Sequence, residues 1–416
     1  MVKIYRILSN FFLLISPLII IYRILKKKES NSRFLERYGF NSIKRKKGNL
    51  IWFHCSSVGE LISIVPIIEK LERNSKINQI LVTTITLSSS KIFKKLNFKK
   101  TVHQFFPIDN GLVINKFINY WSPSAFFLCE SEVWPNLIEK INKYKIKLIL
   151  INGRITLKSF RRWKKLNSFA TNIFEKFDLC FAQNIETQKR LKLLGAKKII
   201  NLGNLKFATS KKIIHNYLES KISNFFKKKK ILITAASTHF NEENFIIKNH
   251  LYFKNIKKTN KIISIIVPRH IERTSEIKKE IESSSLKVHL HSSRKKIDQD
   301  VDIYIVDTYG ELNKFYKISN LVFMGGSLIN HGGQNPLEPA KFGCKIIHGP
   351  NVANFNEIYK KLGNMNISTM FSNYKQGINI IGKSFYKKRL LLDNKKIIKY
   401  GEKILNSTYF EIIKFI

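Results

Sequence analysis

Acidic side chains follow two apolar segments in the first half of the chain. Glu60 ends the small-residue sequence His54–Glu60, directly after Ile51–Phe53, and Glu130 directly follows the apolar Phe126–Cys129. A carboxylate at the end of a buried strand can act as a general base when its surroundings tune its proton affinity. For Glu60 the alternative is structural, because an acidic residue in the first turn of a helix is stabilised by the helix dipole.

Basic residues occupy comparable positions after other apolar runs. Arg154 and Lys206 lie in the first half of the chain, and Arg269 leaves the apolar run Ile262–Val267. Cations at strand ends are suited to phosphate or carboxylate groups of a ligand. In a chain this rich in lysine, a solvated surface cation is the alternative interpretation of Arg154 and Lys206.

The densest motif of the second half is Gly332–Pro339. Its glycine pair permits a ligand to come close to the backbone, and its Asn-Pro dipeptide is typical of a helix start. Glu338 would lie in the first turn of that helix, where its carboxylate can accept hydrogen bonds from the hydroxyls of a ribose. Together these features favour a nucleotide phosphate site.

Several catalytic signatures are absent from the sequence. There is no G-x-x-x-x-G-K-[ST], no G-x-G-x-x-G after the first strand, no H-E-x-x-H and no G-x-S-x-G. The four cysteines lie far apart, and histidines and carboxylates show no metal-ligand spacing. We therefore expect no metal, no cofactor and no disulfide framework.

Short continuous apolar runs recur between helical stretches, a pattern typical of strands buried on both faces of a parallel sheet. They predict two doubly wound, Rossmann-like α/β domains facing a cleft, with ligands at the carboxyl ends of the strands. We assign residues 1–28 to a membrane anchor, 29–208 to an acceptor-binding domain, 209–230 to a linker and 231–416 to a nucleotide-binding domain whose last helix packs back on the first domain. The predicted strands are Leu50–Phe53, Ile80–Thr84, Ala125–Leu128, Lys147–Ile151, Leu179–Phe181, Ile199–Leu202, Ile231–Thr234, Ile262–Val267, Ile303–Val306, Leu321–Met324 and Lys345–Ile347.

The N-terminal segment Ile4–Leu25 is mostly apolar and is followed by Lys26–Lys28. Its uninterrupted core is short of the roughly 20 residues that span a bilayer, so a tilted span and an interfacial helix both remain open. No small-residue cleavage site follows, which argues against a signal peptide. The lysine cluster predicts that the remaining chain stays cytoplasmic.

The charge of the chain is strongly positive. The 416 residues include 74 Lys and Arg against 29 Asp and Glu, a formal charge of +45. This excess favours an anionic partner such as a membrane surface, a phosphorylated substrate or nucleic acid, and compositional drift is the alternative. Nucleic-acid binding would account for the charge but not for the ordered series of strand-end loops, so we expect none. With 44% hydrophobic residues the chain is not disordered.

Eight motifs follow one another along the chain. They are H-C-S-S-V-G-E (54–60), E-S-E-V-W-P-N-L (130–137), G-N-L-K-F (203–207), S-T-H-x-x-E-E (237–243), V-P-R-H (267–270), G-G-S-L (325–328), G-G-Q-N-P-L-E-P (332–339) and G-P-x-x-x-N-F (349–355). In this order they resemble the motifs of the lipid A Kdo transferases, also called 3-deoxy-D-manno-octulosonic acid transferases. The resemblance covers nearly the whole chain and implies a two-domain GT-B glycosyltransferase fold. It also implies metal-independent, inverting transfer of Kdo from CMP-Kdo to a lipid A precursor (lipid IVA) at the cytoplasmic face of the inner membrane.

The same resemblance implies roles for individual residues. The catalytic base falls on Glu60, and the transition-state stabilisers fall on Glu130 and Lys206. Another sugar-nucleotide enzyme of the same fold, such as a 2-epimerase, is the alternative function. The chain departs from the family pattern at Tyr309, Gln334, Asn241 and Ile271, where Met, His, Gly and Pro are common. The implied CMP contacts are Pro268, Arg269, Tyr309, Gly310, Glu311, Asn335, Pro336, Leu337 and Glu338.

Overall fold

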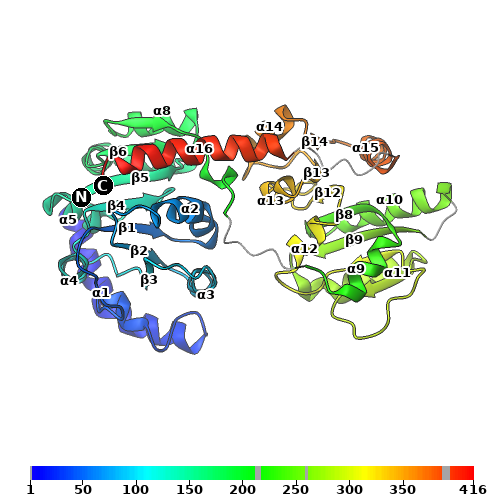
Figure 1. The fold of residues 1–416 in the computed structure, drawn as a ribbon, viewed down its shortest axis with the longest axis horizontal. Helices are drawn as coiled ribbons and strands as arrows, with labels where there is room; N and C mark the ends of the chain where they lie inside the picture. The colour runs from blue at the N-terminus through cyan, green and yellow to red at the C-terminus, as the bar shows by residue number, and fades with distance from the viewer. Residues whose placement is uncertain (1, 211–216, 258–260, 387–393) are drawn as a thin grey trace. The chain divides into compact units, whose positions relative to one another are not determined.

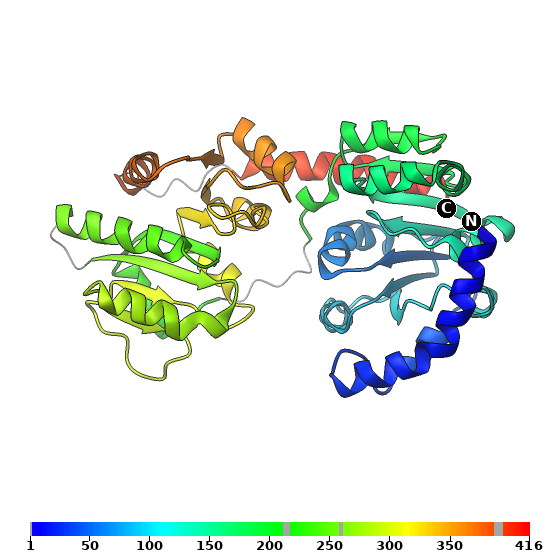
Figure 2. The ribbon, with the colours of Figure 1, turned by 180° about the vertical axis from the view of Figure 1, so that it is seen from behind.

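The computed structural model describes residues 2–210, 217–257, 261–386 and 394–416. The chain forms two compact units, which are drawn from opposite sides in Figure 1 and Figure 2. Unit 1 contains residues 1–213 and 399–416, and unit 2 contains residues 214–398. Each unit is built on a parallel sheet of seven strands within the described residues.

The sheet of unit 1 has the order β3-β2-β1-β4-β5-β6-β7. Its strands are β1 (Leu50–Cys55), β2 (Gln79–Thr84), β3 (Thr101–Phe105), β4 (Ala125–Cys129), β5 (Lys147–Gly153), β6 (Leu179–Ala182) and β7 (Ile199–Asn201). Its helices are α1 (Val2–Leu25), η1 (Phe34–Tyr38), α2 (Val58–Leu71), α3 (Leu87–Lys95), α4 (Gly111–Trp121), α5 (Pro135–Lys143), α6 (Leu157–Lys165), α7 (Asn167–Phe174), α8 (Ile185–Leu193) and η2 (Leu205–Phe207).

Helices of unit 1 begin where a short polar side chain can cap them. In α2, α3, α4, α6 and α8 an extended Ser, Thr or Asn accepts a hydrogen bond from a backbone N–H of the first turn. Because each cap directly follows a strand or its loop, the chain turns sharply from sheet to helix at the carboxyl edge. The capping residues are Ser57, Thr86, Asn110, Thr156 and Asn184.

The central strands of unit 1 are buried on both faces. Every residue of β1, β2 and β4 is buried, as expected for a parallel sheet covered by helices. On one face Trp52 packs between Phe117 of α4 and Phe126 of β4, with ring centroids 4.9 and 4.1 Å away. The Trp52 indole N–H donates to the hydroxyl of Thr83, so the buried polar atom is satisfied.

Unit 2 repeats this architecture with the sheet order β10-β11-β9-β8-β12-β13-β14. Its strands are β8 (Lys230–Thr238), β9 (Ile262–Pro268), β10 (Val288–Leu290), β11 (Ile303–Ile305), β12 (Leu321–Met324), β13 (Lys345–His348) and β14 (Ser368–Met370). Its helices are α9 (Ser220–Lys227), α10 (Glu242–Lys257), η3 (Ile271–Arg273), α11 (Thr274–Ser283), α12 (Leu312–Tyr316), α13 (Leu337–Lys341), α14 (Asn356–Asn364) and α15 (Tyr374–Tyr386).

The α/β fold class and the predicted strands are confirmed, with ends shifted by one to a few residues. Three strands had no prediction: β3, β10 and β14, which lie at sheet edges and are short or carry polar residues. The predicted linker 209–230 also differs from the structure, which forms α9 within it. Phe225 and Phe226 of α9 are buried in the core of unit 2, because this helix covers one face of the sheet. Residues 211–216 of that linker lie outside the described residues.

The two ends of the chain both pack on unit 1. The last helix, α16 (Lys395–Ile413), places Tyr400 against Phe207 with ring centroids 5.1 Å apart and Ile404 beside Gly203. Helix α1 is long and apolar enough to cross a bilayer, and most of its large apolar side chains are exposed. Figure 1 shows α1 along the outside of unit 1, beside α4 and α5.

Polar side chains of α1 attach the helix to the unit. The Tyr5 hydroxyl donates to Asp109 over 2.7 Å, and the Asn110 side chain donates to Asn10 over 2.8 Å. Further along, the Ser16 hydroxyl contacts the Tyr38 hydroxyl at 3.1 Å. The helix therefore turns these polar side chains to the protein, while most of its large apolar side chains face outward.

Gly325 at the end of β12 provides a test of backbone packing in unit 2. A Cβ atom at this position would lie 2.1 Å from the carbonyl oxygen of Ser237, so the end of β8 would have to move. We expect Gly325→Ala to lower the free energy of unfolding of unit 2 by about 2 kcal/mol or more, measured by urea denaturation. Gly363→Ala in α14, where the nearest atom is 3.9 Å away, is the control and should change it by less than about 1 kcal/mol. Equal effects of the two substitutions would contradict this packing.

Candidate active site

The strand order of unit 1 has a switch point between β1 and β4. The chain winds outward from β1 to β3, returns to pair β4 with the other side of β1, and then continues to β7. In open α/β sheets the loops at such a point diverge, and ligands bind there at the carboxyl ends of the strands. The loops after these two strands carry Glu60 and Glu130.

Glu60 is held in the first turn of α2. Its side chain accepts a hydrogen bond of 2.8 Å from the backbone N–H of Ser56 and one of 2.9 Å from the Ser57 hydroxyl. The Ser57 oxygen in turn accepts from the Glu60 backbone N–H, as in a capping box. Ser57 is thus the N-cap of α2, and Glu60 lies in the first turn, the position that the structural interpretation assigns to it.

The same position changes the acidity of Glu60. Partial burial is the main cause that raises its pKa to about 7, and the nearby charges of Glu130 and Glu132 add to the rise. The hydrogen bonds from Ser56 and Ser57 act in the opposite direction. A carboxyl group that titrates near neutral pH is suited to general base catalysis, because it exchanges protons readily at physiological pH.

Glu130 forms an ion pair with Lys206. The Lys206 Nζ atom lies 2.6 Å from Glu130 Oε1, and the Glu130 residue is buried. Lys206 is brought there by η2, which follows β7 at the far side of the sheet. The structure thus brings together two of the predicted catalytic residues, and the charge of Glu130 acts on the third.

Asn152 connects the parts of this site. Its amide nitrogen lies 3.4 Å from Glu130 Oε1, and its amide oxygen accepts from the backbone N–H of Leu205 next to Lys206. Both Glu130 (φ 56°) and Asn152 (φ 53°) adopt the left-handed conformation, which is uncommon for residues other than glycine and clusters at functional sites. The sequence pattern predicts a role for Arg154 but none for Asn152, although an Asn near the end of a buried strand is a signal for a left-handed residue there.

Arg154 contributes its backbone to the same loop. Its N–H donates to the Glu130 carbonyl oxygen over 3.1 Å. Beneath the carboxylates, the thiols of Cys55 and Cys129 lie 3.3 Å apart on adjacent strands and are fully buried. Burial raises the pKa of the Cys55 thiol, so the thiol stays protonated and uncharged. The two cysteines are therefore packed core residues beneath the site.

In unit 2 the switch point lies between β8 and β12, and Glu242 fixes the loops there. Its buried carboxylate accepts hydrogen bonds of 2.7 to 3.0 Å from the backbone N–H groups of Gly326, Ser327 and Leu328, and one of 3.0 Å from that of His239. In the sequence, this residue is noted only as part of the motif S-T-H-x-x-E-E (237–243). Its contact with a loop more than 80 residues away has no local sequence signal.

The predicted CMP contacts lie in a row at the carboxyl edge of this sheet, on the loops after β9, β11 and β12. Arg269 is exposed, and its backbone N–H donates to the Thr238 carbonyl oxygen at the end of β8. The Tyr309 hydroxyl donates to Glu272, which ties the loop after β11 to the loop after β9. Within the loop after β11, Gly310 (φ 87°) permits a tight turn between Tyr309 and Glu311. Glu311 pairs with Lys314.

The loop after β12 contains the other predicted contacts. The Asn335 side chain accepts from the backbone N–H of Leu337, and Pro336 precedes the short helix α13. Pro268 and Leu337 are buried, whereas Glu338 is exposed in the first turn of α13. Gln334 contacts His239, and burial together with nearby basic groups lowers the pKa of that histidine to about 4.

The described residues contain no group of three or more His, Cys, Asp or Glu side chains that could hold a metal ion. Metal independence stays a prediction.

Two parallel α/β units with polar residues at their carboxyl edges define the class of this protein as a GT-B type fold. Solved structures show the same architecture. A putative UDP-N-acetylglucosamine 2-epimerase from Listeria monocytogenes matches with a TM-score of 0.59 and 11% identity, covering 88% of this chain and 96% of its own. The glycotransferase of kitacinnamycin matches with a TM-score of 0.55 and 8% identity, covering 89% of this chain and all of its own. These likenesses concern the fold alone.

Sequence relatives identify the family. The family model described as 3-deoxy-D-manno-octulosonic-acid transferase (Kdo transferase) matches residues 32–209. The enzyme of that name from Rickettsia bellii is 32% identical over 99% of both chains, and that of Haemophilus influenzae is 30% identical over 85% of this chain and 84% of its own. The chain belongs to the 3-deoxy-D-manno-octulosonic acid transferase family and is therefore a glycosyltransferase.

The raised pKa of Glu60 depends in part on Glu130 and can be tested directly. Glu130→Gln removes a nearby negative charge, so we expect the pKa of Glu60 to fall below its wild-type value of about 7. Carbon-13 NMR of labelled glutamate carboxyl groups across a pH titration measures this shift. Glu186→Gln on the exposed face of α8 is the control and should leave the titration of Glu60 unchanged. An unchanged Glu60 titration in Glu130→Gln would show that the two carboxylates are not coupled.

Proposed function

We propose that this chain transfers Kdo from CMP-Kdo to the lipid A precursor lipid IVA and releases CMP, with inversion at the anomeric carbon. Membership of the Kdo transferase family supports the transferred sugar. The observation that carries the catalytic assignment is the position of Glu60, at the switch point of unit 1 with a pKa of about 7 and next to the Glu130–Lys206 pair.

Glu60 is the general base of the proposed reaction. Its carboxylate takes the proton of an acceptor hydroxyl, and the hydroxyl oxygen forms a bond to the anomeric carbon of Kdo. The bond from that carbon to the phosphate oxygen of CMP breaks, so its electron pair leaves with CMP. With a pKa raised to about 7, the Glu60 carboxylate is a stronger base than that of an ordinary glutamate.

Glu130 and Lys206 stabilise the transition state in this proposal. Their ion pair holds a cation and an anion in fixed positions beside the base, where charge develops during transfer. Asn152 holds the pair in position, because its side chain bonds both Glu130 and the backbone N–H of Leu205 next to Lys206. We expect the pair to act by position, since preorganised charges require no rearrangement during the reaction.

Unit 2 binds the CMP-Kdo donor in this proposal. Arg269 at the end of β9 is exposed and can pair with the phosphate of CMP, whose charge grows as the sugar leaves. Tyr309, Gly310, Glu311 and the segment Asn335–Glu338 form the remaining contacts at the same edge. The carboxylate of Glu338, exposed in the first turn of α13, is suited to the ribose hydroxyls.

The proposed location is the cytoplasmic face of the inner membrane. Helix α1 has the length and apolar surface of an anchor, and Lys26–Lys28 follow it. Each basic residue near an anionic leaflet contributes about 1 kcal/mol of attraction. An anionic sugar nucleotide and a phosphorylated acceptor also suit a chain with a formal charge of +45.

Removal of the base tests the catalytic assignment. We expect Glu60→Gln to reduce the rate of Kdo transfer at least about 100-fold, because the acceptor hydroxyl loses its proton acceptor. CMP-Kdo binding, measured by calorimetry, should stay within twofold of wild type, since the predicted donor contacts lie in unit 2. Glu186→Gln is the matched control and should retain full activity. Near-normal turnover by Glu60→Gln would exclude Glu60 as the base.

The lipid product identifies the reaction in the same assay. Mass spectrometry of a tetraacylated acceptor after incubation with CMP-Kdo should show the added mass of Kdo. Turnover of UDP-sugars in place of CMP-Kdo would instead indicate another sugar-nucleotide enzyme.

Metal independence is tested by chelation. Because positioned side chains rather than an ion are proposed to stabilise the leaving phosphate, we expect the transfer rate to be unchanged in excess EDTA. Added Mg²⁺ should not increase it. Loss of activity in EDTA with recovery on addition of Mg²⁺ would overturn this part of the proposal.

A further inference from the structure

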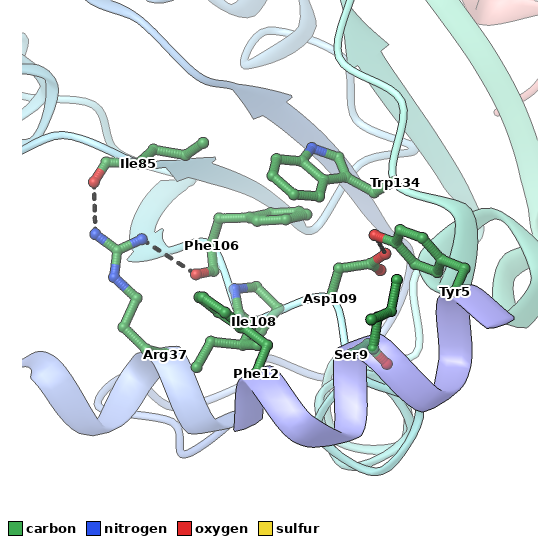
Figure 3. A pocket seen from close by; sticks show the side chains of 11 residues that line it. Tyr5, Ser9, Phe12, Arg37, Ile85, Phe106, Ile108, Asp109 and Trp134 are labelled. Atoms are coloured by element: carbon green, nitrogen blue, oxygen red, sulfur yellow. Dashed lines mark hydrogen bonds between the residues drawn. The ribbon is translucent and has the colours of Figure 1, made fainter. Parts of the chain in front are cut away.

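A cavity of about 480 Å³ lies between α1 and the strand-end loops of unit 1. Its volume is within the range of small-ligand sites. Figure 3 shows side chains from α1 on one side, with the loop after β3 and Trp134 opposite them. Most of the wall is apolar. The side chains that form this apolar part are chiefly those of Leu8, Phe12, Ile85, Phe106, Ile108 and Trp134.

Charged side chains of the wall are already engaged by the protein. Asp109 accepts from the Tyr5 hydroxyl and from the backbone N–H groups of Asn136 and Leu137. Arg37 donates to the Glu29 carboxylate and to the carbonyl oxygens of Ile85 and Phe106. A polar or charged ligand would have to break these bonds, whereas an apolar ligand only removes apolar wall from water.

The cavity is continuous with the outward surface of α1. Leu8 and Phe12 line the cavity and are also 61% and 48% exposed. On the same helix Ile4, Ile7 and Phe11 are exposed as well, so an anchored α1 would place the cavity beside the hydrocarbon of the membrane. A chain of a membrane lipid can therefore reach the cavity without crossing water.

A series of contacts links the cavity to the proposed base. The Phe106 ring stacks on the His54 ring with centroids 3.8 Å apart, and His54 lies 3.4 Å from the Ser56 hydroxyl. The Ser56 backbone N–H donates to the Glu60 carboxylate. On the other side Trp134, whose ring centroid is 5.2 Å from that of Phe106, lies in the loop that begins with Glu130. The apolar cavity thus adjoins both loops of the catalytic switch point.

We propose that this cavity binds one hydrocarbon chain of the acceptor lipid and thereby positions its reacting hydroxyl near Glu60. The proposal rests on the proposed function, in which the acceptor is an acylated lipid. It adds a binding subsite formed jointly by the anchor helix and the catalytic unit. Helix α1 then has a second role, because it forms one wall of a substrate site as well as attaching the chain to the membrane.

Fluorescence quenching tests occupancy with the full-length protein in detergent. Bromine atoms quench tryptophan at contact, and Trp134 lines the cavity while Trp52 and Trp121 are fully buried. We expect dibrominated stearate, but not stearate, to quench part of the emission, and Trp134→Phe to remove most of that part. Ile108→Phe, which fills the cavity, should also reduce the quenching. Ile256→Phe on the exposed surface of α10 is the matched control and should not.

Kinetics distinguish the acceptor from other sources of a hydrocarbon chain. We expect Ile108→Phe to raise the KM for a tetraacylated acceptor by about tenfold, the effect of a misfitted group in an apolar pocket. The KM for CMP-Kdo and the transfer rate to a deacylated acceptor should not change. Ile85→Phe is a second filling variant, and thermal unfolding shows whether either variant is folded.

The outcomes separate this proposal from the proposed function. If the wild type forms no Kdo product on the tetraacylated acceptor, the proposed function fails. If the wild type is active but a folded filling variant keeps the wild-type KM for that acceptor, the cavity proposal is overturned. Quenching by dibrominated stearate with an unchanged acceptor KM would likewise overturn it, because the occupant would then be a bilayer lipid.

Discussion

Burial of both sheets on two faces is the constraint on which the rest of this structure depends. Every residue of the central strands β1, β2 and β4 is buried, so a polar side chain within them needs an internal partner. His54 meets this requirement by bonding Thr83 and stacking on Phe106, and burial lowers its pKa to about 3. Groups that must change charge or bind a ligand are left to the strand ends. The proposed catalytic and donor-binding residues of the two units accordingly lie at the carboxyl edges of their sheets.

The chain contains few acidic residues, and several of them are held by specific hydrogen-bond or ion-pair partners. Glu36 accepts from Arg33, Ser42 and the Phe105 backbone, while Glu242 holds the loop after β12. Glu130 has Lys206 as its partner, whereas partial burial keeps the pKa of Glu60 high. Compositional drift stays our interpretation of most of the positive excess. An anionic membrane surface, as proposed, would tolerate that excess.

Helix α1, the proposed membrane anchor, packs as part of unit 1. One side of the helix is fixed to the neighbouring loops by hydrogen bonds, in which Tyr5 donates to Asp109, while Ser9 and Asn10 accept from the side chains of Asn136 and Asn110. Its other side exposes apolar residues. Because Asp109 also caps the start of α5, the anchor and the loop that carries Glu130 share one set of bonds. In the proposed membrane-bound arrangement, packing within unit 1 would set the distance from the membrane to the site.

The sequence by itself determined the fold class, the central strands and the loops that carry the site, because buried parallel strands are continuous apolar runs and the motifs directly follow them. It did not predict β3, whose Thr, His and Gln residues tolerate an edge position, or α9, whose two phenylalanines stand in a lysine-rich stretch. Only the tertiary structure decided that Lys206 meets Glu130, that Asn152 joins their loops and that Glu242 binds the backbone of Gly326. These residues are separated by 22 to 84 positions along the chain, and no local pattern encodes a contact that arises only when strands distant in sequence become neighbours in a sheet.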